Sequence, residues 1–196
     1  MNLSTPSEAA CSEVPDTPER LAARECGFIT GVFDAAAVTL RQEVRDACAE
    51  DKCRAYGKNW SCPPACGGLE EWGKRMREYR SGILLQTKGY TEDSFDYDSM
   101  ERIGEEHNRR LGAFQEKIEM LFADTAGDRP WLLLGSGGCK ICAQCTYPSA
   151  PCAFPGKMIV SLEAAGIVVS ELCQLSDVPY YYGPDTLTYT GCLFIN

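Results

Sequence analysis

Apolar residues recur at helical spacing in two stretches of the chain. The first is "LEEWGKRMREYR", which begins at Leu69, and the second runs from about Ser99 to Ala123. In each stretch apolar side chains return every three or four residues, as on one face of a helix. The apolar positions are Leu69, Trp72, Met76 and Tyr79 in the first, and Ile103, Leu111, Phe114, Ile118, Leu121 and Phe122 in the second. The pattern predicts one helix in each stretch.

Shorter apolar runs lie between these stretches and indicate strands. "GILLQT" at 82–87 and "WLLLGS" at 131–136 are continuous apolar runs of strand length, and "TLTYTGCLFI" at 186–195 partly alternates. "GKMIVSLEAAG" at 156–166 predicts a helix that ends at Gly166, and "IVVS" after it predicts a brief strand or extended link. We therefore expect an α/β or α+β fold: a short central sheet with packed helices and two cysteine-rich metal-binding loops.

The two loops interrupt this pattern, and they hold eight of the twelve cysteines. Cysteine is concentrated there among glycines and prolines, which break helices and strands. The members are Cys48, Cys53, Cys62 and Cys66, the first quartet, and Cys139, Cys142, Cys145 and Cys152, the second quartet. Such a concentration of thiols is typical of a disulfide framework, a zinc site or an iron–sulfur cluster.

The second quartet has the more specific spacing. Its first three cysteines form a C-x2-C-x2-C run, as in bacterial ferredoxins, although Ala153 and not proline follows the fourth. Structural zinc sites usually pair two short knuckles across a longer gap, so the spacing favours a [4Fe-4S] cluster and leaves zinc as the alternative. Gly137 and Gly138 precede the run, and we expect their backbone N–H groups to approach the cofactor.

The first quartet matches no common zinc knuckle. Its Cys62-Pro63 step resembles the Cys-Pro step of ferredoxins, and Tyr56 and Trp60 are candidates to shield a cluster from water. Two quartets provide enough thiolates for two [4Fe-4S] clusters, or the loops could share one. Within this quartet Cys66 is the weakest candidate. The isolated Cys11, Cys26, Cys173 and Cys192 are interpreted as packed or surface thiols.

Charge and composition limit the classes of binding partner and the cellular location that we expect. The formal net charge is −9, which disfavours nucleic-acid binding, and no apolar run is long enough to cross a membrane. Residues 1–18 have the composition of a flexible N-terminal arm and lack the features of a secretory signal, so we expect residues 19–196 to form a single cysteine-rich domain in the cytoplasm. Thiols stay reduced there, which favours metal binding over disulfides.

Other catalytic arrangements have little support. His107 is the single histidine, and its polar neighbours in "ERIGEEHNRR" predict an exposed helix residue. One histidine excludes multi-histidine metal sites, and "GSGGCK" lacks the Gly-Lys-Ser/Thr order of a phosphate-binding loop.

At "CRAYGKNWSCPP", "GCKICAQC" and "SLEAAGIVV" the chain resembles an uncharacterised family of bacteria and archaea described as predicted metal-binding proteins, a cysteine-rich domain of unknown function. The resemblance covers about residues 25–196. It implies a metal site and no particular reaction. The ligands it implies are Cys48, Cys53, Cys62, Cys139, Cys142, Cys145 and Cys152.

These features together predict an iron–sulfur protein with one or two [4Fe-4S] clusters that transfers electrons to or from a redox partner protein. One alternative is a cluster-dependent reductase of a small molecule or cofactor. The other is a binding module in which zinc only holds the loops in place. The sequence does not indicate an oligomeric state.

Overall fold

A computed structural model describes residues 16–124 and 131–196, and its centre is a five-stranded sheet. The strand order is β1-β2-β5-β3-β4. The strands are β1 (Ile29–Asp34), β2 (Ser81–Tyr90), β3 (Trp131–Gly135), β4 (Val160–Ser161) and β5 (Thr186–Ile195). All neighbours are antiparallel except β3 and β4, which pair in parallel. The long β2 and β5 pair over their full lengths and form the middle of the sheet.

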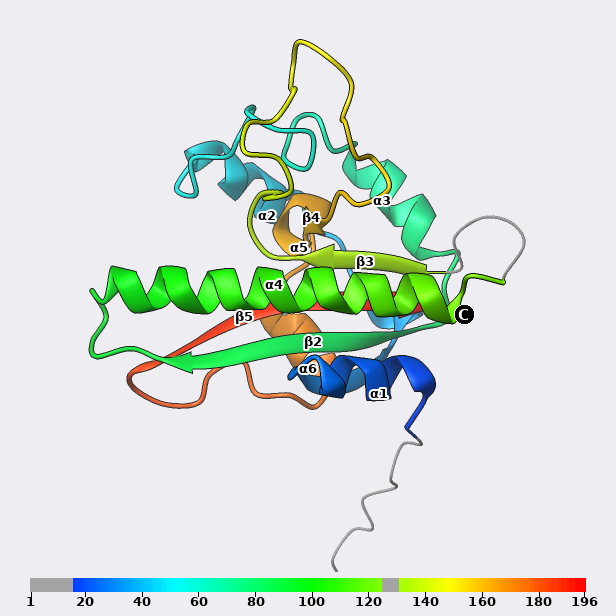
Figure 1. Ribbon diagram of the computed structural model, residues 1–196, viewed down its shortest axis with the longest axis vertical. Helices are drawn as coiled ribbons and strands as arrows, with labels where there is room; N and C mark the ends of the chain where they lie inside the picture. The colour runs from blue at the N-terminus through cyan, green and yellow to red at the C-terminus, as the bar shows by residue number, and fades with distance from the viewer. Residues whose placement is uncertain (1–15, 125–130) are drawn as a thin grey trace, which may run out of the picture.

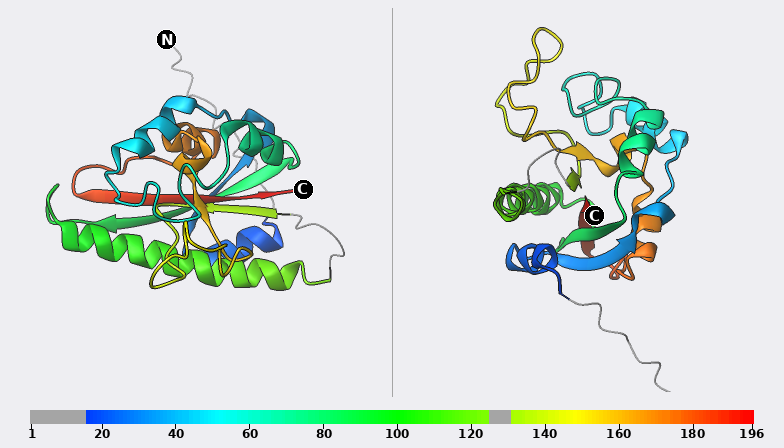
Figure 2. Two further views of the ribbon diagram at one scale, coloured as in Figure 1. Left: turned by 90° about the horizontal axis from the view of Figure 1, so that it is seen from above. Right: turned by 90° about the vertical axis from the view of Figure 1, so that its right-hand side faces the viewer.

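Helices cover both faces of this sheet (Figure 1; Figure 2, right). On one face lie α1 (Pro18–Glu25) and the long α4 (Tyr97–Leu121). On the other lie the remaining helices and short 3-10 turns: η1 (Ala35–Ala37), α2 (Gln42–Ala47), η2 (Cys48–Glu50), α3 (Leu69–Met76), α5 (Leu162–Ala165) and α6 (Val169–Leu175). The architecture confirms a mixed α/β fold with a short central sheet.

The two hydrophobic cores follow from the alternation of side chains along each strand. Ile83 and Leu85 pack toward α1 and α4, whereas Leu84 between them packs toward α3, α5 and α6. In β5, Leu193 and Phe194 divide in the same way. A strand buried on both faces reads as a continuous apolar run, which is why "GILLQT" and "WLLLGS" show no alternation of polarity.

The region 156–166 differs from the prediction of one helix. Val160 and Ser161 form β4 against the end of β3, and only the four residues of α5 are helical after them. The Ser161 hydroxyl accepts a hydrogen bond from the backbone N–H of Ala164 and caps α5. Gly166 ends it as predicted, with φ of 92° in the left-handed region. "IVVS" contributes to the start of α6 instead of forming a strand.

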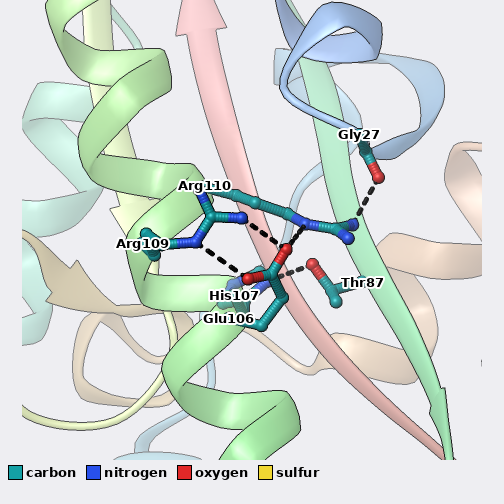
Figure 3. A network of polar contacts seen from close by, with 6 residues as sticks. All are labelled: Gly27, Thr87, Glu106, His107, Arg109 and Arg110. Carbon is teal, nitrogen blue, oxygen red and sulfur yellow. Dashed lines mark hydrogen bonds and ion pairs between the residues drawn. The ribbon is translucent and has the colours of Figure 1, made fainter.

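The prediction of an exposed His107 is wrong. Its side chain is fully buried, because position 107 falls in phase with Ile103 and Leu111 on the inner face of α4. The ring Nδ1 lies 3.0 Å from the Thr87 hydroxyl of β2 (Figure 3). The ring also packs edge-on against Phe28. Burial, with a smaller effect of the nearby Arg110, lowers the pKa of His107 to about 3, so the imidazole is neutral.

The charged neighbours that suggested exposure point outward from the same turn of α4. The Glu106 carboxylate accepts hydrogen bonds from Arg109 and Arg110, and Arg110 also donates to the carbonyl of Gly27 (Figure 3). This network ties α4 to the turn between α1 and β1. In the parts of the chain described here, no helix combines the length and the apolar character needed to cross a membrane.

Candidate metal centre

Both cysteine-rich loops extend from the same end of the molecule. The first loop, residues 48–68, leads from η2 to α3, and the second loop, residues 136–159, connects β3 to β4. They lie side by side beyond the β3–β4 edge of the sheet (cyan and yellow in Figures 1 and 2). Segments that are about 80 residues apart in sequence thus form one region of the surface.

Polar and aromatic contacts hold the loops together. The backbone N–H of Cys139 donates to the Ser61 hydroxyl at 2.9 Å, and Ser61 in turn donates to the Asn59 side chain at 2.7 Å. The Trp60 indole N–H donates to the carbonyl of Ala150 at 3.1 Å. The Trp60 ring also stands perpendicular to that of Tyr147, with the centroids 5.0 Å apart. These contacts hold the two loops against each other.

All four cysteines of the second quartet line one cavity. We call it the second cavity, after the second quartet. It has a volume of about 240 Å³, and residues 58–61 of the first loop also line it. The side chain of Trp60 is part of that wall. The C-x2-C-x2-C run therefore wraps around a space bounded by the neighbouring loop.

The first cavity, of about 500 Å³, is lined by three members of the first quartet: Cys48, Cys53 and Cys62. Gly137 and Gly138 of the second loop form part of its wall, as do Tyr56 and Glu163. The predicted cofactor-binding glycines thus face the cavity of the first quartet. The two aromatic residues that are candidates to shield a cluster from water lie at different cavities. Tyr56 lines the first cavity and Trp60 lines the second.

Gly138 allows the two loops to approach closely. A Cβ atom at this position would lie 3.2 Å from both the Ala55 Cβ and the Asn59 Nδ2, and 3.5 Å from the Cys62 Sγ. In the first loop, Ser61 lines the second cavity and Cys62 lines the first cavity. In the second loop, Gly138 lines the first cavity and Cys139 lines the second. Two adjacent residues from each loop therefore form the wall that the cavities share.

Cys66 lies apart from the other members of the first quartet. Its thiol is 3.9 Å from the carbonyl of Ala164, and it lines a separate hollow with Trp72 and Cys152. The side chain also packs against the apolar core beneath α3 and α5. The ranking of Cys66 as the weakest ligand candidate of the first quartet stays a prediction.

Burial and neighbouring thiols raise the pKa values of several of these cysteines. Burial raises the pKa of Cys48 to about 11, with further contributions from Glu163 and from the other thiols of the first quartet. Burial likewise raises the pKa values of Cys62, Cys66 and Cys139, and for Cys139 the other thiols of the second quartet add to the effect. Each quartet is therefore an interacting group, and a metal bound there must displace protons from the thiols.

Within residues 16–124 and 131–196, no three His, Cys, Asp or Glu side chains are gathered closely enough to hold one metal ion. Four thiolates around a zinc ion lie about 3.8 Å from one another, given tetrahedral Zn–S bonds of about 2.3 Å. In a [4Fe-4S] cluster each thiolate binds a different iron, so the ligands stand farther apart. All eleven cysteines in the described parts are free thiols, and Cys11 lies outside the described residues.

Residues 31–195 match the family model of predicted metal-binding proteins, DUF2284. The chain belongs to this family. The match spans both cysteine loops and all of the sheet except the first two residues of β1, and it confirms the family resemblance found in the sequence. Neither a curated protein nor a solved structure matches the chain.

In this member of the DUF2284 family, two further residues of the site were not identified from sequence. Arg45 is buried and donates to the carbonyls of Ala164 and Gly67. Glu163 reaches the first cavity from the first turn of α5, and burial raises its pKa. Neither position carries a local sequence signal, because only the packing of α5 against the first loop brings them to the site.

Proposed function

We propose that this protein is an iron–sulfur electron carrier with two [4Fe-4S] clusters, one in each cavity. The observation that carries the proposal is the division of the cysteines between two cavities that share a wall. The second quartet would hold one cluster, and the cysteines that line the first cavity would hold the other. When bound, such clusters supply one-electron redox chemistry.

The residues around the cavities fit this cofactor. Thiolates are the usual ligands of iron–sulfur clusters, and both cavities carry them on irregular loops that can wrap a compact inorganic group. Gly137 and Gly138 leave backbone N–H groups without side-chain cover at the first cavity, where hydrogen bonds to cluster sulfides help to set the potential. Tyr56 and Trp60 restrict the access of water.

The shared wall suits electron transfer between two centres. Cys62 and Cys139 belong to different quartets, yet they are linked through Ser61, which precedes Cys62 and accepts the hydrogen bond of Cys139. One hydrogen bond and one peptide unit thus separate a ligand of each site. A short path of this kind would let an electron enter at one cluster and leave from the other.

A partner protein is needed to deliver or accept the electron. The chain carries a net charge of −9, so a partner with a basic docking surface would be attracted over long range. Such an association would weaken as ionic strength rises.

Metal analysis of anaerobically purified protein tests the proposal. We expect iron and acid-labile sulfide in equal amounts and a broad visible absorption that bleaches on reduction. Cys142→Ala should lose iron, whereas Cys173→Ala, at a buried thiol away from the loops, should keep it. Colourless protein with stoichiometric zinc would contradict the proposal and support the zinc-stabilised module.

A cluster-dependent reductase is a second candidate function. It is favoured by the volume of the first cavity, about 500 Å³ against about 240 Å³ for the second, which leaves room beside a cluster. This function requires an iron without a protein ligand. A change in the electron paramagnetic resonance (EPR) spectrum on addition of a small ligand such as cyanide would support it.

A further inference from the structure

The first cavity contains three cysteines, whereas a [4Fe-4S] cluster has four irons to ligate. The sequence offers Cys66 as the fourth ligand, but its side chain lines a different hollow. Two carboxylates also line the first cavity, the exposed Glu43 and the more buried Glu163. The question is whether Cys66 or Glu163 completes the site.

Glu163 lines the cavity from α5, an element distant in sequence from the first loop. It stands in the first turn of α5, directly after β4, and Ser161 and Ala164 on either side of it line the same cavity. Cys48 and Glu163 line this cavity together. The cavity is thus lined by three thiols from the first loop and by Glu163 from α5, together with the exposed Glu43 and Lys52.

The Ser161 hydroxyl and the backbone N–H of Glu163 are the polar groups beside its carboxylate. The basic side chain that lines the same cavity, Lys52, is exposed and pairs with Glu50. Taking a carboxylate out of water without a cation is costly, and a metal centre is one way to compensate for that cost. Carboxylate oxygen is an established ligand of protein iron, and clusters accept ligands other than cysteine.

Cys66 has different surroundings. Its thiol lies between the carbonyl of Ala164 and the Trp72 indole, with the Arg45 guanidinium nearby. The side chain packs against the apolar core, as expected of a small hydrophobic residue. It is near enough to Cys48 and Cys62 to affect their pKa values, so it is the competing fourth ligand in any test.

We infer that the Glu163 carboxylate, and not the Cys66 thiolate, is the fourth protein ligand of the cluster in the first cavity. The inference rests on the proposed function, because it assumes a [4Fe-4S] cluster there. It also refines that function. A cluster with four protein ligands leaves no iron open to a substrate, which favours an electron carrier over a reductase.

Four variants test the ligand set: Cys66→Ala, Glu163→Cys, Glu163→Gln and, as a positive control for ligand loss, Cys48→Ala. Each is prepared anaerobically and reconstituted with iron-57 and sulfide, and circular dichroism checks the fold. Iron and sulfide per chain are measured together with the Mössbauer spectrum, in which an iron with an oxygen ligand differs from irons ligated by sulfur alone. This readout does not depend on any activity.

We expect Cys66→Ala to keep the iron content and the spectrum of the unsubstituted chain. Cys48→Ala should lose about half of the iron, which corresponds to one of two clusters. Glu163→Cys should keep the iron but remove the oxygen-ligated site from the spectrum, and Glu163→Gln should alter the same site.

Two results would overturn the inference while leaving the proposed function intact. They are a loss of iron in Cys66→Ala equal to that in Cys48→Ala, and a Mössbauer spectrum that is unchanged in both Glu163 variants. Absence of iron and sulfide from the unsubstituted chain would instead overturn the proposed function, and the inference with it.

Discussion

The hydroxyl of Ser61 accepts a hydrogen bond from the backbone N–H of Cys139 at 2.9 Å, and thereby joins the two cysteine loops. Ser61 is fully buried, so water cannot replace it as a partner of this N–H group. The bond also fixes the start of the C-x2-C-x2-C run against the first loop. The relative position of the two cavities therefore depends on a residue that is not itself a metal-ligand candidate.

Ser61→Ala should loosen both sites. The Cys139 N–H would lose its acceptor in a part-buried position, which typically costs about 1 kcal/mol. We expect a lower free energy of unfolding and faster loss of iron to a chelator, measured by denaturant titration and by the decay of visible absorption. Ser149→Ala, at an exposed position of the second loop, is the matched control. Equal chelation rates in the two variants would argue against the bridging role.

Gly138→Ala tests the close approach of the loops. The new methyl group would meet Ala55 and Asn59 at 3.2 Å, a distance that forces the loops to separate by a few tenths of an ångström. We expect weakened retention of iron, seen as faster chelation. Gly112→Ala on α4 is the control, because a Cβ there meets no atom within 4 Å. That variant should gain up to about 1 kcal/mol of stability from helix propensity.

Sequence patterns predicted three of the five strands, β2, β3 and β5, because these are apolar runs that are largely buried in the sheet, and they did not predict β1 or β4. "GILLQT" and "TLTYTGCLFI" became β2 and β5, and their apolar runs are the direct signature of burial. The prediction failed at 156–166, where a parallel pairing of two residues with β3 replaced a helical turn. That pairing is set by tertiary contact with a distant strand and leaves no periodicity in so short a segment.

For the site, cysteine spacing identified the two loops but could not divide their residues between cavities. The position of Cys66 and the presence of Glu163 in the first cavity both depend on α5, which lies about 100 residues beyond the first loop in sequence. His107 shows the same limit on α4. Its immediate neighbours are charged, and only the helical phase set by Ile103 and Leu111 reveals that it points inward.

Arg45→Met should destabilise the fold around the first cavity. Arg45 is buried and its guanidinium donates to the carbonyls of Gly67 and Ala164, so it ties the end of the first loop to α5. Methionine keeps much of the apolar stem but leaves these carbonyls without a donor. We expect the free energy of unfolding to fall by about 2–4 kcal/mol. Lys74→Ala, which breaks an exposed ion pair with Glu70, should change it by less than about 0.5 kcal/mol.

Because His107 is buried and neutral, we expect the protein to lose stability in mild acid. Its pKa is about 3 in the folded chain because of burial, against 6.5 for an unperturbed histidine, so between these values the unfolded chain binds a proton that the folded chain does not. Stability therefore rises with pH through this window. It is retained in full above about pH 6.5, and is lost by up to about 1.4 kcal/mol for each pH unit below it.

The variant His107→Gln isolates this effect, because glutamine can still bond to the Thr87 hydroxyl but does not titrate. Urea midpoints measured at pH 7 and pH 5 should differ more in the unsubstituted chain than in the variant. Carboxylates and bound metal contribute to the pH dependence of both proteins alike, so the comparison between the two removes their contribution. An equal drop in both would mean that His107 takes up its proton in the folded state, at a pKa well above 3.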